Sequence, residues 1–260
     1  IYSVLTFMDV DMNTDHAGVA LLGNPEINLD GPKTVELDAR NAQEITANVP
    51  EKTEANFRKL EFHRSFGEPN IVIGQYQLPP TMDKMYAEPA VAVTNGVLDM
   101  NTRWRLVKPL ITINHGETEL DVLAQAGSTL IEGKHQLSAV YAGYGAPENY
   151  VGLDVKDKVV VVKRSDKISG PARAEAAYTA GAKLVITVND SPTELVEWVG
   201  KEDYSGDNPI AVVSVSGTEG EKLIKAVGSG EITLNIEGTI DSPYVYDLVD
   251  DYQMHIPEDL

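Results

Sequence analysis

Hydrophobic and polar positions alternate with the period of a β-strand through the first part of the chain. The alternation occurs in short runs, and these runs are separated by clusters rich in Gly, Pro, Asn and Asp, such as MNTDHAG, FGEPN and LPPT. Such clusters are typical of the turns between strands. The strands predicted in this way are residues 2–8, 18–23, 34–38, 44–49, 57–65, 70–75, 90–94 and 103–107. No convincing helical period occurs before residue 120, so we expect a β-sandwich-like region, or parts of two β units, over residues 1–117.

The second part of the chain changes character. Continuous apolar runs at residues 159–163, 184–188 and 210–215 are typical of strands that are buried on both faces. Because helical patterns separate these runs, the pattern indicates strand–helix–strand units with parallel pairing. Further strands are predicted at residues 128–132, 137–145 and 232–236. We therefore expect a small mixed sheet or open barrel, in a chain that is mainly β with α+β character.

Three short helices are predicted to flank this sheet. The first begins at the Gly-Pro pair of residues 170–171, because Pro is favoured at the first helical position, and Gly181 ends it. The second begins where the letters SPTE have the spacing of a capping box, and Gly200 ends it. The third is capped by either Ser216 or Thr218, each of which has a Glu three residues further on.

Composition narrows the classes of partner. The 260 residues contain 40 Asp and Glu against 21 Lys and Arg, which gives a formal net charge of −19. A surface this acidic repels phosphate backbones and anionic lipids, so we expect neither nucleic acid nor membrane as a partner. The chain contains no Cys, so thiolate chemistry and disulfides are excluded. The chain begins IYSVLTFMDV, in the middle of a predicted strand, and we interpret it as a piece of something longer or a processed product.

Several motifs of the second part occur in the order found in one known family. KVVVVKR is followed by AEAAYTAGAKLVITVN and then by NPIAVVSVSGTEGEKLIKAV, and YAGYGAPENYVGLDVKDK leads into the first of them. This succession resembles the protease-associated (PA) domain over about residues 125–237. Two features depart from the family pattern: Asp157 stands where Gly is frequent, and the loop SDKISG lacks the usual Cys or Gly-Gly. The core pattern survives both departures, and they bear only on the function of that loop. The resemblance implies a non-catalytic domain.

The flanking segments carry a second resemblance. YSVLTFMDV and the following AGVALLGNPEINLDGPKTVELDARNAQEI are similar to a β-sandwich of large secreted subtilisin-like serine peptidases of actinobacteria. SPYVYDLVDDYQMHIPEDL resembles the segment that leaves the PA domain in such proteins. The resulting organisation is a β-sandwich-like region at 1–117, a PA domain at 118–240 and a linker or tail at 241–260. The resemblance also implies a secreted, extracellular protein.

The sequence offers no catalytic constellation. The five histidines, which are His16, His63, His115, His135 and His255, are isolated among turn and strand residues, and no G-x-S-x-G elbow is present. The zinc motif H-E-x-x-H is absent as well. The letters GYG at residues 143–145 begin like a dinucleotide fingerprint, but no third Gly and no helix follow. We assign no catalytic, cofactor-binding or metal-binding residue.

Two weaker features remain. Asp9, Asp11, Asn13 and Asp15 alternate oxygen side chains as a calcium ligand set does, but Thr14 replaces the turn Gly of an EF-hand loop. We favour a polar hairpin connection over a calcium site there. The second feature is a group of aromatic residues that could line a peptide groove, although packing around the sheet is the preferred interpretation. These residues are Tyr141, Tyr144 and Tyr150.

The sequence thus predicts an accessory segment that is not itself an enzyme. The resemblance implies that the PA domain positions protein or peptide substrate, controls access to a peptidase site or packs against the catalytic domain of its parent. Exposed loops such as residues 164–170 could contact a peptide without any reactive group. Two alternatives stay open. The segment could contribute directly to a peptidase active site, or it could be a purely structural spacer.

Overall fold

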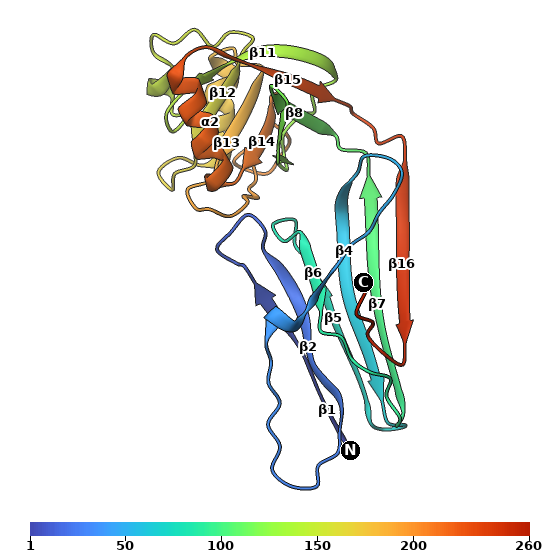
Figure 1. The fold of residues 1–260 in the computed structure, drawn as a ribbon. Helices are drawn as coiled ribbons and strands as arrows, with labels where there is room; N and C mark the ends of the chain where they lie inside the picture. The colour runs from blue at the N-terminus through green and yellow to red at the C-terminus, as the bar shows by residue number, and fades with distance from the viewer. The chain divides into compact units, whose positions relative to one another are not determined.

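The fold is described from a computed structural model, which covers residues 1–260. The chain forms two compact units. The first comprises residues 1–12, 16–108 and 243–260, and the second comprises residues 13–15 and 109–242. The architecture is mainly β, as the sequence predicted, with two α-helices that both belong to the second unit (Figure 1). No helix is long and apolar enough to cross a membrane.

The first unit contains two four-stranded sheets. One sheet has the order β1 (Tyr2–Val10), β2 (Gly18–Ile27), β6 (Lys84–Ala87) and β3 (Gln43–Ile45). The other has the order β16 (Val245–Gln253), β7 (Val97–Val107), β4 (Glu54–Ser65) and β5 (Ile71–Gln77). Alternate residues of both sheets contribute to one apolar core, which includes Val19, Met85, Leu60 and Met100. This packing of two sheets across a shared core is that of a β-sandwich.

Three details of this unit differ from the sequence predictions. Residues 34–38 form no strand, and residues 90–94 contribute only an isolated bridge between Ala90 and Ile256. The short strand β6 was not predicted. Residues 241–260, expected to be a linker or tail, contain β16, which pairs with β7 along its whole length. This strand was not predicted because its acidic side chains resemble those of a solvated linker. They lie at exposed positions of β16, where Asp247 forms an ion pair with Arg105 of β7 at 2.7 Å.

The second unit is built around a sheet of eight strands. Its order is β10 (Leu123–Ala124), β14 (Ala211–Val215), β13 (Leu184–Val188), β12 (Val159–Lys163), β11 (Gly133–Tyr141), β15 (Ile232–Gly238), β8 (Ile111–His115) and β9 (Thr118–Leu120). The four strands from β11 to β14 are parallel, as the strand–helix alternation predicted. β15 then returns antiparallel to β11. Residues 128–132 form no strand, although they were expected to.

Two α-helices cover opposite faces of the parallel strands. Val160 and Val162 of β12 pack with Ala174 and Ala177 of α1 (Gly170–Thr179) in one apolar cluster. The alternate residues of the same strand belong to a second cluster, which contains Leu223 of α2 (Gly217–Ser229). This division explains why β12, β13 and β14 are apolar at most positions, since both faces are covered.

Both α-helices begin where the sequence predicted. Ser169 caps α1 by accepting a hydrogen bond from the main-chain N–H of Ala172, and Gly181 follows the helix with a φ of +89°. Ser216 caps α2 by accepting from the main-chain N–H of Glu219, at 3.1 Å. Two short 3₁₀ turns, at Ala39–Asn41 and Pro147–Tyr150, complete the helical structure.

The helix predicted between residues 191 and 200 does not form, and this corrects the expectation of three flanking helices. The segment is irregular because buried side chains of neighbouring strands and loops bind the main-chain groups that a helix would pair internally. The amide of Gln125 donates to the carbonyl of Leu195 and accepts from the N–H of Glu197. Asn189 donates to the carbonyl of Thr193 at 2.8 Å.

Candidate binding site at the carboxyl ends of the parallel strands

The parallel strands of the second unit end at the same edge of the sheet, and this edge is hollowed. Because β11, β12, β13 and β14 run in the same direction, the loops that follow them gather there. They enclose a cavity of about 640 Å³. Its lining comprises Tyr144 after β11, Lys163 to Lys167 at the end of β12, Asn189 to Pro192 after β13, and Gly217, Thr218 and Glu221 at the start of α2. A crevice at this position is where open α/β sheets usually bind ligands.

The main chain of the cavity wall is fixed by close contacts. Gly217 donates its N–H to the carbonyl of Ser191 at 2.9 Å. A Cβ atom at Gly217 would lie 2.1 Å from that carbonyl oxygen, so only Gly permits this approach. On the opposite wall, Gly143 and Gly145 adopt positive φ values of +56° and +72°. They bring Tyr144 into the cavity lining, with 53% of its surface exposed.

Asn189 organises the loop after β13. Its side chain is buried, with 6% of its surface exposed. The amide nitrogen lies within hydrogen-bonding distance of the carbonyls of Thr193 and Glu194, at 2.8 and 3.2 Å, and of the hydroxyl of Ser191 at 3.1 Å. The amide oxygen accepts from the N–H of Asp190 at 2.9 Å. One buried amide therefore determines the course of residues 190–194.

Arg164 joins the loops after β12 and β13. Its guanidinium is 2.6 Å from the carboxylate of Asp190 and 2.8 Å from that of Asp166. Burial lowers the pKa of Arg164, but the hydrogen bonds and charges of these two carboxylates outweigh burial and raise it overall. Arg164 is therefore charged at every physiological pH.

A second ion pair links β12 to α2. The ammonium of Lys163 lies 2.5 Å from the carboxylate of Glu221, and this hydrogen bond raises the pKa of Lys163. Lys167 adds a third cation to the lining. The lining thus contains three basic side chains and three acidic ones, the latter being Asp166, Asp190 and Glu221. This balance contrasts with the net charge of −19 of the whole chain.

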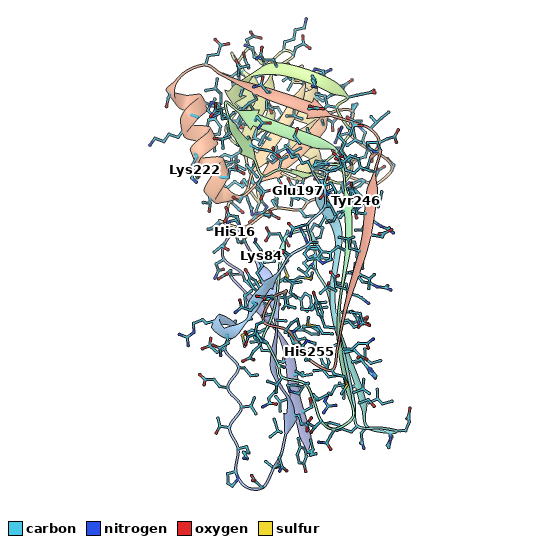
Figure 2. The ribbon with its side chains drawn as sticks, turned by 45° about the vertical axis from the view of Figure 1, so that its right-hand side comes forward. His16, Lys84, Glu197, Lys222, Tyr246 and His255 are labelled. Atoms are coloured by element: carbon cyan, nitrogen blue, oxygen red, sulfur yellow. The ribbon has the colours of Figure 1, made fainter.

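The five histidines lie outside this cavity. His63 of β4 is 3.4 Å from the carboxylate of Asp99, and His135 is 2.7 Å from the carbonyl oxygen of Glu132. His255 contacts the carbonyl of Gln253 at 3.0 Å. Figure 2 shows His16 and His255 at well-separated places in the first unit. The cavity at the carboxyl ends of the parallel strands, called the carboxyl-edge cavity below, is lined instead by charged side chains and main-chain groups.

Of the four residues considered for calcium, one lies in β1 and the other three, Asp11, Asn13 and Asp15, lie in the connection between β1 and β2. Asp9 lies in β1, where its carboxylate accepts a hydrogen bond from the hydroxyl of Tyr76 at 2.9 Å. Asp9 and Asp11 belong to the first unit, whereas Asn13 and Asp15 belong to the second. No group of three or more His, Cys, Asp or Glu side chains has the arrangement of a metal site.

One of the three tyrosines considered for a peptide groove lines the cavity, and the other two pack in or against the apolar clusters. Tyr150 is buried in the cluster beneath α1, where burial raises its pKa to about 12. Tyr141 packs against the cluster on the opposite face of the sheet. Tyr144 alone lines the carboxyl-edge cavity. Asn189 and Gly217, which shape that cavity, were missed from the sequence, although an Asn directly after a buried strand was visible.

The fold and the cavity define a small α/β module with a parallel core and a polar, charge-balanced crevice at its carboxyl edge. The family model of the PA domain matches residues 123–223. This segment is therefore a PA domain, as the sequence motifs predicted. A comparison with curated proteins found no match.

Solved structures show partial likenesses. An aminopeptidase from Aneurinibacillus sp. strain AM-1 has a TM-score of 0.45 and 22% identity, covering 61% of this chain and 36% of its own. A zinc aminopeptidase from Bacillus subtilis has a TM-score of 0.42 and 19% identity, covering 58% and 35%. A subtilisin-like protease from the Antarctic psychrotroph Pseudoalteromonas sp. AS-11 has a TM-score of 0.34 and 16% identity, covering 64% and 45%. The chain thus spans less than half the length of each of these proteins.

Proposed function

We propose that the PA domain of this chain binds an extended segment of polypeptide in the carboxyl-edge cavity. The observation that carries this proposal is the balanced lining, in which three cations and three anions surround a polar crevice. A polypeptide main chain carries donors and acceptors in equal number and no net charge. A crevice of this kind suits it better than it suits a polyanion, which requires an excess of positive charge.

The walls support the same conclusion. Arg164 and Lys163 are held by ion pairs to Asp190 and Glu221, so their remaining N–H donors are presented in fixed positions. Tyr144 adds an exposed aromatic face, and aromatic residues are frequent in protein interfaces. Pre-organised donors reduce the entropy that is lost on binding.

A pair of matched variants tests the site. Lys167→Glu reverses an exposed charge of the cavity lining, and Lys225→Glu makes the same change on α2 outside it. Binding of dye-labelled peptides from unfolded casein is followed by fluorescence anisotropy. We expect Lys167→Glu to weaken binding at least fivefold, while Lys225→Glu changes it less than twofold. Equal effects of both variants would show that net charge, not the cavity, governs binding.

We further propose that the chain is a non-catalytic accessory segment of a secreted, extracellular subtilisin-like serine peptidase. The motif order of the PA domain and the flanking resemblances support this setting. The full reading frame is then expected to encode a signal peptide and an upstream Asp/His/Ser catalytic domain. The alternative is a segment that contributes directly to a peptidase active site. Casein hydrolysis by this chain alone, abolished by a serine-directed covalent inhibitor, would favour that alternative.

The catalytic domain of the parent is the second partner that this setting offers. Its binding to the chain, measured by the same anisotropy method, separates a docking role from substrate capture. If neither casein peptides nor the catalytic domain binds, the chain is a structural spacer and the proposal of a peptide site is wrong.

A further inference from the structure

Arg64 of the first unit is a buried cation without a carboxylate in contact. It lies on β4, and only 2% of its surface is exposed. Its Nε donates to the carbonyl of Pro25 at 2.8 Å, and its Nη1 is shared among three further carbonyls at 2.9 to 3.1 Å. The guanidinium also lies 3.8 Å from the ring centroid of Phe66. These partners are neutral, so they satisfy donors without neutralising the charge.

The one carboxylate that acts on this charge is Glu26. Its charge raises the pKa of Arg64, but burial is the larger effect and lowers it. The carboxylate of Glu26 is itself occupied by the N–H groups of Thr94 and Asn95 and by their side chains. These hydrogen bonds lower the pKa of Glu26 to about 2. Arg64 is therefore left with a charge that no direct contact compensates.

Two polar atoms in this region have no hydrogen-bond partner. They are Nη2 of Arg64 and the hydroxyl oxygen of Ser3 on β1. A buried polar group without a partner is costly, and an uncompensated buried charge is more so. The two residues come from different sheets of the sandwich and line the same cavity, of about 670 Å³. The volume is in the range of small-molecule sites.

The rest of the lining combines polar and apolar groups. Asn70 and the hydroxyl of Tyr2 are the other polar side-chain groups. The apolar lining residues are Ile1, Leu5, Phe62, Phe66, Pro69, Ile71 and Val72. β1 and β5 are the outermost strands of their sheets, so the cavity lies where the sandwich is open (Figure 1). A buried guanidinium and polar groups next to several apolar side chains fit a ligand with an anionic head and an apolar body.

We propose that this cavity binds a carboxylate carried on an apolar chain, with the guanidinium of Arg64 and the hydroxyl of Ser3 as its receptors. The carboxylate accepts the donor of Arg64 that no protein group uses and supplies the missing negative charge. The apolar chain lies against Phe62, Phe66 and Ile71. This site belongs to the sandwich and is independent of the function proposed for the PA domain.

Three probes of matched chemistry test the proposal by thermal unfolding and calorimetric titration of the whole chain. Decanoate has the tail and the carboxylate, decanol has only the tail, and acetate has only the carboxylate. We expect decanoate to raise the melting temperature of the first unit and to bind at least tenfold more tightly than either of the others. Equal binding of decanoate and decanol, or no binding of decanoate and of the peptide described next, would overturn the proposal.

The source of the carboxylate is distinguished by a second pair of probes. Acetyl-Gly-Leu-Phe with a free carboxyl terminus is compared with the same peptide as its amide. Tighter binding of the free acid than of decanoate assigns the site to peptide termini, and the reverse order assigns it to acyl chains. Either order supports a carboxylate receptor.

Two variants locate the receptor. Arg64→Met is expected to reduce the affinity for the carboxylate probe about a hundredfold, while binding of decanol stays within twofold. Ser3→Ala removes an unpartnered hydroxyl, so it is expected to keep or raise the stability of the fold and to weaken carboxylate binding about fivefold. If Arg64→Met fails to fold, the carboxylate affinity of Ser3→Ala alone tests the proposal. Unchanged carboxylate affinity in a folded variant would show that Arg64 and Ser3 have only structural roles.

Discussion

Replacement of Asn189 by Ala removes the side chain that holds the irregular loop after β13. The amide nitrogen has two hydrogens, so it satisfies at most two of its four near acceptors at once. Two lost hydrogen bonds cost about 2 kcal/mol, and the half-buried carbonyls of Thr193 and Glu194 are left without these donors. We expect the second unit to lose about 2 to 3 kcal/mol of unfolding free energy. Its melting temperature should fall by about 10 °C.

Urea unfolding followed by the fluorescence of Trp198 measures this loss. Trp198 lies in the affected segment, stacks on Tyr204 with ring centroids 5.3 Å apart and donates its indole N–H to the carbonyl of Lys201. The chain has only one other tryptophan, Trp104 of β7 in the first unit. A Trp104→Phe background therefore makes the signal specific for the PA domain.

Two further variants control the interpretation. Asn189→Asp keeps the oxygen that accepts from Asp190 but removes both donors, so it should be at least as destabilising as Asn189→Ala. Asn235→Ala changes an exposed amide on β15 of the same unit and should cost less than about 0.5 kcal/mol. A loss below 0.5 kcal/mol for Asn189→Ala, or wild-type stability of Asn189→Asp, would refute the role assigned to the amide donors.

Three other predictions concern pH, packing and calcium. Burial raises the pKa of Glu219 from 4.5 to about 7, so the contribution of this side chain to the stability of the second unit is fully present below pH 4.5 and falls as the pH rises to 7, by about 1 to 2 kcal/mol after a discount for its partial exposure to solvent; the difference in stability between the wild type and Glu219→Gln, measured by urea titrations, should show this slope. Gly217→Ala should cost about 2 kcal/mol and weaken peptide binding, whereas Gly228→Ala, in open space on the same helix, should stabilise by about 0.5 kcal/mol. Millimolar calcium should leave the melting temperature unchanged, because no three His, Cys, Asp or Glu side chains have the arrangement of a metal site; a clear rise would restore the calcium site.

Local signals explain which elements of the second unit were predictable. The signals that begin or end α1 and α2 affect only the few residues next to them, and both helices were predicted from these signals. The signals are the Gly-Pro pair of residues 170–171, Gly181 and Ser216. The sequence SPTE has an equally good local signal, yet no helix forms there. Gln125, which binds the main chain of Leu195 and Glu197, lies about 70 residues away, as its sequence separations of 70 and 72 show. A contact between residues so far apart in the chain cannot be predicted from the sequence pattern around residues 191–200.

The same reasoning applies to the first unit. The alternation in VYDLVDDYQ is a strand pattern, but its partner β7 lies more than 140 residues earlier, as the separation of Arg105 and Asp247 by 142 residues shows. Acidic residues near the end of a chain suggest a linker when no partner is visible. Pairing with β7 buries the apolar positions only in part, and the exposed Asp side chains then face solvent. Long-range pairing, not local preference, produced this strand.

The candidate site was predictable only in its first loop. Residues 164–170 were singled out because a loop after a buried strand is exposed and rigidly supported. The balance of charge could not be predicted, because its members come from three loops that are distant in sequence. The ion pairs Lys163–Glu221 and Arg164–Asp190 form only when β12, β13 and β14 lie side by side in the sheet. In an acidic chain, three of the 21 basic residues gather at one edge and are matched there by three acids. That neutral crevice is a property of the sheet order. For this reason the Lys167→Glu and Lys225→Glu pair tests the fold's contribution to recognition, because both variants change the net charge equally but only Lys167→Glu alters the balance of charge in the lining.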